Sequence, residues 1–481
     1  MKIVGSRVTM PINLGNPRTC ESGHRDHPLK ADLQPLIEKV DLAHEDRDRS
    51  LDRTRVFSAR RDGHRGMVVW LLLGPGLLAM LGENDGPSML SYAFSGATYG
   101  IGFFLPFIAL TFAAAYVVQE MSMRLGAVTH RGYGELIFQR FGPFWGWVSA
   151  GDLFVTNLIT LITEVIAIRI GMGFFGISAP IAVACAVGLV VLSACGSRYS
   201  RWERIAMGLA LFNLVFVAVA ILTHPSPLVL GHALLTWTPF PQGSASVFLL
   251  ILASNIGATV TPWMLFFQQS ASADKGLTPR DLPQGRLDTL IGTVLAAVAG
   301  CAALVAAVPL FTHHIDMSQN LGGTGFPQAL LPLIGRPAAT LFALGLIEAG
   351  AVAMLTISAS TAYAVSEVAG GVGHSFNQSI REAPLFHVAN VGVAAMAGAI
   401  VLIPGTPLLA IALNANLLAT VLMPPALVFL LILASDREIM GPNINSRLTN
   451  FLGILITTLV TAAGSAYAIV ALLDTFHAKG H

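Results

Sequence analysis

Charged side chains are scarce in this chain. Asp, Glu, Lys and Arg make up 11% of its 481 residues, whereas 54% are hydrophobic and the mean hydropathy is +0.67. A soluble domain carries about 25% charged residues, so this composition predicts a polytopic membrane protein surrounded by the lipid bilayer. The net charge of +1 argues against a nucleic-acid partner, because nucleic-acid-binding domains are strongly basic.

Cysteine is also rare. The four cysteines, Cys20, Cys185, Cys195 and Cys301, show no CxxC spacing, and the last three lie within apolar runs. This pattern predicts neither a disulfide framework nor a zinc site. The sequence shows no recognisable spacing of a nucleophile and a base, so we expect no enzyme and no cofactor.

The first 62 residues lack long apolar runs and contain six arginines between positions 47 and 61. The apolar core and cleavage site of a signal peptide are missing from this segment. We expect residues 1–62 to form a mostly disordered cytosolic tail, and residues 63–481 to form a transmembrane domain.

Beyond this tail the chain is dominated by apolar runs. A helix needs roughly 20 apolar residues to cross a bilayer. By this measure the sequence predicts an all-α protein with eleven transmembrane helices, at about 67–98, 100–123, 145–172, 177–196, 205–223, 246–270, 287–312, 338–369, 385–404, 408–435 and 449–474.

The loops between these runs alternate in basic content. The loop after the second run contains Arg124, Arg131 and Arg140, whereas loop 224–244 has no Lys or Arg and loop 313–337 has only Arg336. Loops rich in Lys and Arg stay in the cytoplasm. We therefore expect a multi-pass protein of the plasma (inner) membrane, with its N-terminus in the cytoplasm and its C-terminus outside.

The first apolar run has an acidic interruption. Residues 67–82 carry no charge, but Glu83, Asn84 and Asp85 follow where the middle of the bilayer is expected, and Gly86-Pro87 comes next. A charge at that depth costs about 2.5–3.5 kcal/mol and suggests a function. Gly and Pro disfavour a helix, and broken backbone in the membrane lines a cavity or is buried in protein. The combination predicts a cation site; a structural carboxylate in a kinked helix is the alternative.

The sixth run has an interruption of its own at residues 257–262, Gly-Ala-Thr-Val-Thr-Pro. It lies five runs after the first interruption and would cross the membrane in the opposite direction. Paired interruptions in two halves indicate a transport site at the bilayer midplane. We expect inverted repeats at about 67–223 and 246–435, followed by an additional helix at 449–474. A kink for packing alone is the alternative for the sixth run.

The third run carries a polar stripe. Asp152, Thr156, Thr160 and Glu164 are spaced by four residues and share one helix face. They could line an aqueous path or form interhelical hydrogen bonds. Glu348, in the eighth run, is a further intramembrane acid whose partner the sequence does not identify.

Several motifs together resemble the NRAMP family of divalent metal transporters. They are the GPG…D…GATYG layout of the first run, QEMSMRLG after the second, GATVTP in the sixth and SDREIMGP after the tenth. The resemblance covers roughly residues 66–474. It implies the LeuT-type fold, a 5+5 inverted repeat with discontinuous helices 1 and 6 that bind the metal between their unwound parts.

The resemblance also implies a ligand set. The Asp-Pro-Gly-Asn signature of helix 1 corresponds to Asp85-Gly86-Pro87-Ser88, and the Met-Pro-His of helix 6 corresponds to Thr261-Pro262-Trp263. The carbonyl ligand corresponds to Ala258 and the helix-ten glutamine to Asn416. The candidate metal ligands are therefore Asp85, Ser88, Ala258, Thr261 and Asn416, and the candidates for the ion path or coupling are Glu83, Glu164 and Gln268.

The departures from the family signature suggest a different substrate preference. A thioether favours transition metals, whereas carboxylate, hydroxyl, amide and carbonyl oxygens suit Mg²⁺, Ca²⁺ or Mn²⁺. Thr261 replaces the family's methionine, as in the NRAMP-related magnesium transporters, so we expect Mg²⁺ as the substrate, with Mn²⁺ as the second candidate. Leu161 and Gln268 occupy positions of titrating residues in the family, so we expect uptake without proton coupling.

Three alternatives stay open at this stage. The first is proton-coupled Mn²⁺ or Fe²⁺ transport, the usual activity of the family. The second is transport of an organic substrate such as an amino acid with Na⁺, and the third is a sensor that does not transport. The sequence leaves the oligomeric state open and is compatible with a monomer.

Overall fold

The computed structural model describes residues 47–195, 199–315, 325–369, 376, 378, 380–406 and 408–479. The chain divides into two units, residues 1–47 and 48–481. Most of the predicted tail therefore lies outside the described residues. Its last part is helical: α2 (Arg47–Arg61) is tied to the start of a later helix by an ion pair between Arg60 and Asp281 (2.6 Å).

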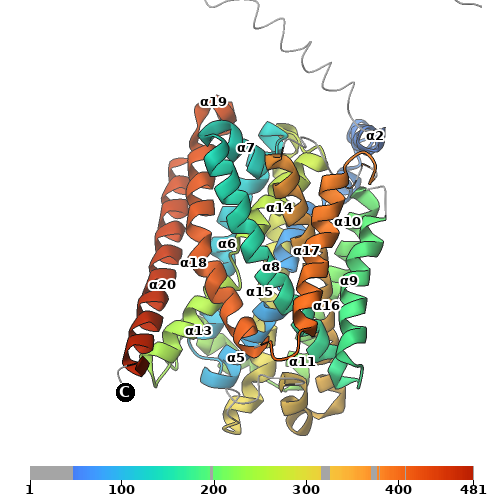
Figure 1. Cartoon of the computed structure of the whole chain (residues 1–481). Coiled ribbons are helices and arrows are strands. Elements are labelled where there is room, and N and C mark those ends of the chain that lie inside the picture. Colours follow the sequence, from blue (N-terminus) through green and yellow to red (C-terminus); the bar gives the residue numbers. More distant parts are fainter. Residues whose placement is uncertain are drawn as a thin grey trace, which may run out of the picture. The chain divides into compact units, whose positions relative to one another are not determined.

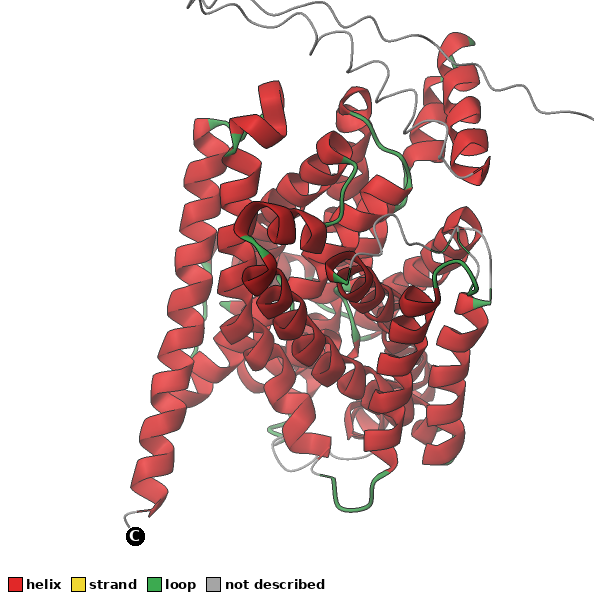
Figure 2. Cartoon of the chain, turned by 45° about the horizontal axis from the view of Figure 1, so that its top comes forward, coloured by secondary structure: helices red, strands yellow, loops and turns green. Residues whose placement is uncertain are grey.

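Every regular element in the described ranges is a helix, and none is a strand (Figure 2). Each of the eleven predicted runs contains helix. In chain order these are α3–α5 (Arg65–Leu72, Pro75–Gly82, Gly86–Tyr99), α6 (Phe104–Thr129), α8 (Pro143–Phe174), α9 (Ala179–Ala194), α10–η1–α11 (Tyr199–Ala210, Leu211–Leu214, Val215–Leu222), α13–α14 (Ala245–Gly257, Pro262–Asp274), α15 (Leu282–Thr312), α16 (Gly325–Val368), α17 (Pro384–Leu402), α18 (Leu408–Ser435) and α20 (Arg447–Lys479).

Length and composition support the membrane assignment of these helices. Within the described residues, nine helices are long and apolar enough to cross a bilayer, and the bent pair α3–α4 makes a tenth. The remaining run, α9, is apolar but only 16 residues long. Short helices occupy the connections: α7 (Tyr133–Phe141), α12 (Pro227–Thr236), η2 (Pro279–Asp281), α19 (Arg437–Met440) and η3 (Gly441–Asn443).

Two features differ from the sequence prediction. The predicted loop 313–337 is partly helical, because α16 begins at Gly325 and is kinked at Gly335 (φ 79°, ψ 166°). The first run is also broken twice: besides the break at residues 83–85, the chain bends by 49° between α3 and α4. Asp288 of α15 stabilises this extra bend, since its carboxylate accepts hydrogen bonds from the amides of Gly74 (3.0 Å) and Gly76 (2.7 Å) at the start of α4.

The two broken helices run in opposite directions. Figure 1 shows α5 at the opposite end of the bundle from α2 and α7, and α13 at that same end with α14 leading away from it. This antiparallel arrangement is what inverted repeats require.

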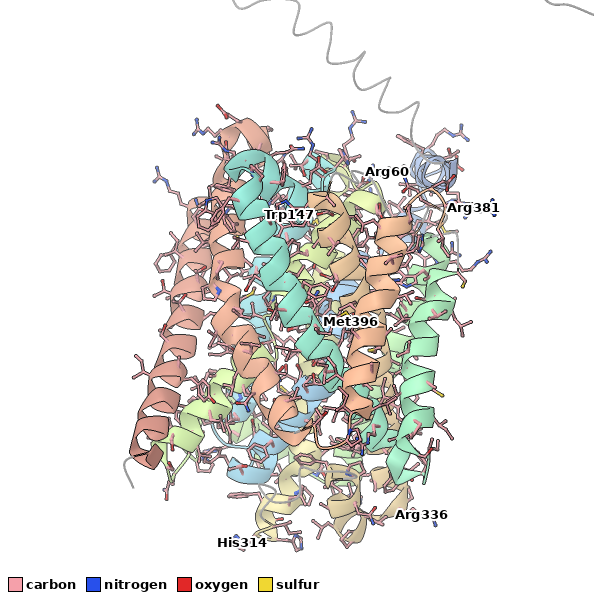
Figure 3. All side chains as sticks on the ribbon, viewed as in Figure 1. Arg60, Trp147, His314, Arg336, Arg381 and Met396 are labelled. Atoms are coloured by element: carbon pink, nitrogen blue, oxygen red, sulfur yellow. The ribbon has the colours of Figure 1, made fainter. Side chains whose placement is uncertain are left out.

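The ends of the bundle differ in the residues that they carry. Figure 3 shows Arg60 and Arg381 at the end that carries α7, and His314 and Arg336 at the other. We name these the α7 end and the His314 end. Between them, apolar side chains such as Trp147 (55% exposed) and Met396 (46% exposed) lie on the outer faces, as expected for surfaces that contact lipid.

Candidate metal site

The two helix breaks lie against each other in the bundle interior. Helix α4 ends at Gly82 and α5 begins at Gly86, whereas α13 ends at Gly257 and α14 begins at Pro262. The Thr261 hydroxyl donates to Glu83 Oε2 (2.7 Å), and the Tyr92 hydroxyl donates to the Ala258 carbonyl (2.6 Å). The predicted interruptions of runs one and six are thus confirmed, and side chains join them.

Local sequence explains where both breaks fall. Pro87 and Pro262 lie in the first turns of α5 and α14, where a missing amide hydrogen is tolerated but from which a helix cannot extend backwards. Asp85 is the N-cap of α5, with extended backbone (φ −71°, ψ 174°), and its Oδ1 accepts the amide of Ser88 (2.9 Å). Thr261 holds the same position before α14.

A third acidic side chain reaches the break from α8. Glu164 Oε2 accepts a hydrogen bond from the Gly86 amide (2.9 Å). A side chain at position 86 would collide with α8, because an added Cβ would lie 2.2 Å from Ala167 Cβ. Glycine therefore serves two purposes here: it lets α8 approach closely, and it supplies an amide that proline could not.

The three carboxyl groups are withdrawn from solvent. Glu83 and Glu164 are 0% exposed and Asp85 is 1% exposed, and Asp85 and Glu164 lie close enough to interact electrostatically. Glu83 Oε1, Asp85 Oδ2, Glu164 Oε1 and the Ser88 hydroxyl have no hydrogen-bond partner among the described residues. Buried, unpartnered carboxyl and hydroxyl oxygens at a break in a membrane helix are chemically suited to bind a cation.

These three acids alone do not form a complete metal-binding site. Within the part of the chain that is described, no group of three or more His, Cys, Asp or Glu side chains is arranged to hold a metal ion. A divalent ion at Asp85 would therefore complete its shell with neutral oxygens and water. Mg²⁺ commonly binds in this way, through one or two carboxylates and several waters.

Asn416 lies on the His314 side of the break rather than beside Asp85. Its amide donates to the Ser91 hydroxyl (2.9 Å), which in turn contacts the Ser254 hydroxyl (2.9 Å). Gly257 permits this packing of α13 on α18, since an added Cβ would lie 1.8 Å from the Asn416 carbonyl oxygen. Asn416 thus connects α5, α13 and α18 just beyond the candidate ligands.

Gln268 lies on the α7 side of the helix breaks. Two turns along α14 from Thr261, its amide donates to the Thr289 hydroxyl of α15 (2.8 Å). It therefore belongs to the packing of α14 on α15, towards the α7 end, and no hydrogen bond within the described ranges joins it to the three acids.

The residues of the polar stripe on α8 differ in the contacts that they make. The hydroxyls of Thr156 and Thr160 donate to carbonyls of their own helix, at Asp152 and Thr156 (both 2.9 Å). The interhelical bond comes instead from Asn157, which donates to Thr361 of α16 (2.9 Å). Of the stripe, Glu164 is the member that reaches the helix break.

Sequence reasoning missed two residues that shape this region. Tyr92 follows Asp85 by seven residues, so its place on the same face of α5 could have been read from helical spacing. Asn213 is the partner of Glu348 (3.3 Å) that the sequence did not identify. An isolated polar residue in an apolar run gave no indication of which helix it would face.

The sequence matches one protein family and curated relatives that are named divalent metal cation transporters. The Nramp family, described as "Natural resistance-associated macrophage protein-like", matches residues 76–470. The divalent metal cation transporter MntH of Aeromonas hydrophila is 28% identical over 420 residues, which cover 84% of this chain and 96% of the relative. MntH of Mycobacterium tuberculosis is 28% identical over 322 residues, which cover 63% of this chain and 71% of the relative.

Solved structures agree with the fold. A manganese transporter of Eremococcus coleocola, in complex with an aromatic bis-isothiourea compound, matches with a TM-score of 0.67 and 20% identity, covering 82% of this chain and 86% of that one. MhsT in complex with L-phenylalanine matches with a TM-score of 0.55 and 16% identity, covering 82% and 97%. The expected all-α, LeuT-type fold with discontinuous helices 1 and 6 is confirmed. Since the family match extends over residues 76–470, the chain belongs to the Nramp family.

Proposed function

We propose that this protein carries divalent metal cations across the plasma membrane and prefers Mg²⁺ to Mn²⁺. Relatives that align with 84% of the chain are named divalent metal cation transporters, which supports the general activity. Asp85 is the anchoring ligand, helped by Ser88, the Ala258 carbonyl and Thr261, directly or through water. Asn416 closes the site on the His314 side.

The preference for Mg²⁺ rests on one observation: the helix-six break presents a hydroxyl where the family signature has a thioether. Thr261 is 2% exposed and faces Glu83. Soft sulfur ligands select transition metals, whereas an all-oxygen site does not discriminate against Mg²⁺. Since Mg²⁺ is reluctant to lose water, the small side chains of Ser88 and Thr261 suit a partly hydrated ion.

The driving force in this proposal is electrical. With the basic α7 end in the cytoplasm, a divalent cation entering through the membrane gains about 4.6 kcal/mol per 100 mV. This energy suffices for accumulation without protons. The N-terminus would then lie in the cytoplasm and the C-terminus outside.

Competition for uptake into proteoliposomes tests the preference. Wild type and Thr261→Met are compared for uptake of Mn²⁺ in the presence of excess Mg²⁺. We expect Mg²⁺ to compete strongly in the wild type and weakly in Thr261→Met. Thr261→Val is the matched control, because it removes the hydroxyl without adding sulfur. If Thr261→Met and Thr261→Val have the same ion profile as wild type, position 261 does not set selectivity.

The second candidate function is proton-coupled Mn²⁺ transport. The observation that favours it is the placement of two further buried carboxyl groups, Glu83 and Glu164, around Asp85. A solved relative at 20% identity is also a manganese transporter. A pH-sensitive dye inside the proteoliposomes separates the two proposals: acidification that requires metal entry, together with no Mg²⁺ transport, would establish the second.

A further inference from the structure

A second buried polar cluster lies on the other side of the helix-one break. Asn84 donates through Nδ2 to Asn213 Oδ1 (3.1 Å) and to the Ala296 carbonyl of α15 (2.8 Å). The Asn213 amide in turn donates to the Asn84 carbonyl (3.2 Å) and to Glu348 Oε2 of α16 (3.3 Å). Four segments of the fold thus meet around one carboxylate.

The cluster is buried and incompletely paired. Asn84 and Asn213 are 0% exposed and Glu348 is 4% exposed. Glu348 Oε1 and Asn84 Oδ1 have no hydrogen-bond partner in the described part of the chain. Asn213 brings these two side chains together, because its single amide group contacts both. Two oxygen acceptors, one from a carboxyl group, are therefore left without a donor in the protein interior.

The backbone around the cluster is irregular. Helix α4 ends at Gly82, two residues before Asn84, so the negative end of its dipole lies near these oxygens. Asn213 belongs to η1 (Leu211–Leu214), a 3₁₀ turn between α10 and α11, and such turns within long helices often mark functional positions. In membrane transporters, the C-terminal ends of half-helices and unwound carbonyls coordinate cations.

We propose that Glu348, Asn84 and Asn213 form a binding site for a monovalent alkali cation. The single carboxylate of the cluster matches a single positive charge, and the unpartnered Asn84 Oδ1 adds a neutral oxygen ligand. The site is separate from that region, since Asn84 points to η1 and α15 while Glu83 and Asp85 engage Thr261 and Ser88. It goes beyond the proposed function, because a bound cation would link the helix-one break to η1 and α16 whichever divalent ion is carried.

Thermal unfolding of the purified full-length protein in lipid nanodiscs tests the proposal. The midpoint is measured during titration with NaCl, LiCl or KCl, with choline chloride replacing the salt at constant ionic strength. Ligands that bind the native state raise its stability in a saturable way. We expect a saturable rise with at least one alkali cation and none with choline. Binding of radiolabelled sodium to the same samples provides a second readout.

Three variants locate the effect. Glu348→Gln should lose the saturable shift, whereas Glu438→Gln, an exposed acid at the α7 end, should keep it. Asp85→Asn should keep it too, because the proposed site does not include Asp85. If wild type shows no cation-specific shift, or if Glu348→Gln keeps it, the proposal is wrong and Glu348 has a structural role only. If Glu348→Gln does not fold, Asn84→Ala, which removes the other unpartnered oxygen of the cluster, takes its place and should lose the shift. Failure of divalent transport would leave this result unaffected.

Discussion

Asp85 combines two tasks that can be separated. Its carboxylate caps α5 through the Ser88 amide, and its second oxygen is free of hydrogen bonds to any described residue. Asparagine caps helices as well as aspartate does, but it brings no charge to a cation. Replacing Asp85 by asparagine should therefore keep the helix cap and remove the negative charge.

We accordingly expect Asp85→Asn to fold normally and to lose divalent uptake by more than about 10-fold, a loss that even outer partners of a metal site can cause. Uptake of Mn²⁺ and Mg²⁺ into proteoliposomes measures this. Asp62→Asn is the matched control, because the Asp62 side chain forms an exposed ion pair with Arg61 (3.3 Å). Uptake by Asp85→Asn at the level of Asp62→Asn would remove Asp85 from the site.

Thr261 contributes to stability as well as to ion choice. Its hydroxyl is the hydrogen-bond donor to the fully buried Glu83 carboxyl group (2.7 Å). Thr261→Val should lower the free energy of unfolding by about 1–3 kcal/mol, because a buried acceptor loses its donor. Thr261→Ser should stay close to wild type. Denaturation in nanodiscs gives the comparison, and equal stability of the Val and Ser variants would contradict the role of the hydroxyl.

At the scale of the element, the order of Gly86 and Pro87 is matched to Glu164. The family signature has proline directly after the aspartate, and a proline there would have no amide hydrogen for Glu164 Oε2. The reversed order in this chain supplies that hydrogen and the room that α8 needs next to Ala167.

Restoring the family order with the double substitution Gly86→Pro and Pro87→Gly should therefore impair both folding and uptake. Adding Ala167→Gly should relieve the steric part alone, so stability should recover partly while uptake stays low. Pro87→Ala serves as the control that keeps the Gly86 amide. Thermal unfolding and proteoliposome uptake of the three variants separate the two effects, and normal uptake by the reversed pair would show that the Gly86 amide is dispensable.

The elements also show which features could be predicted from sequence. The breaks before α5 and α14 were predicted because Pro87 and Pro262 act locally and leave a direct signature in the sequence. The bend before α4 was not found, because it depends on Asp288, which lies more than 200 residues further along the chain. Likewise, the stripe on α8 indicated a shared face but not which member would reach the break. Helix breaks caused by nearby prolines can be predicted from the sequence, whereas side-chain contacts between distant helices can be identified only once the fold is known.

At the scale of the whole molecule, the candidate site is closed towards both ends. On the His314 side, Asn416 and Ser91 join α18 to α5. On the α7 side, the Lys275 ammonium group at the end of α14 bonds to the Leu73 carbonyl and forms an ion pair with Glu203 of α10 (2.8 Å). Both contacts involve a half of a broken helix, so opening of either end requires that the contact at that end breaks.

Removing the Lys275 contact should therefore open the α7 end selectively. The Lys275 and Glu203 side chains are only 11% and 5% exposed, and loss of one partner of a buried pair costs about 3–5 kcal/mol, enough to shift the population between states. Opening is measured as the rate at which a charged thiol reagent labels Ser272→Cys, a buried position one turn before Lys275, in a background without the native cysteines. We expect Lys275→Met to accelerate labelling and Lys275→Arg to leave it slow.

Arg286→Met, which breaks a more exposed ion pair with Glu120 (2.9 Å), controls for general loosening. Equal labelling rates in Lys275→Met and Arg286→Met would mean that the closure of this end does not depend on the Lys275 ion pair.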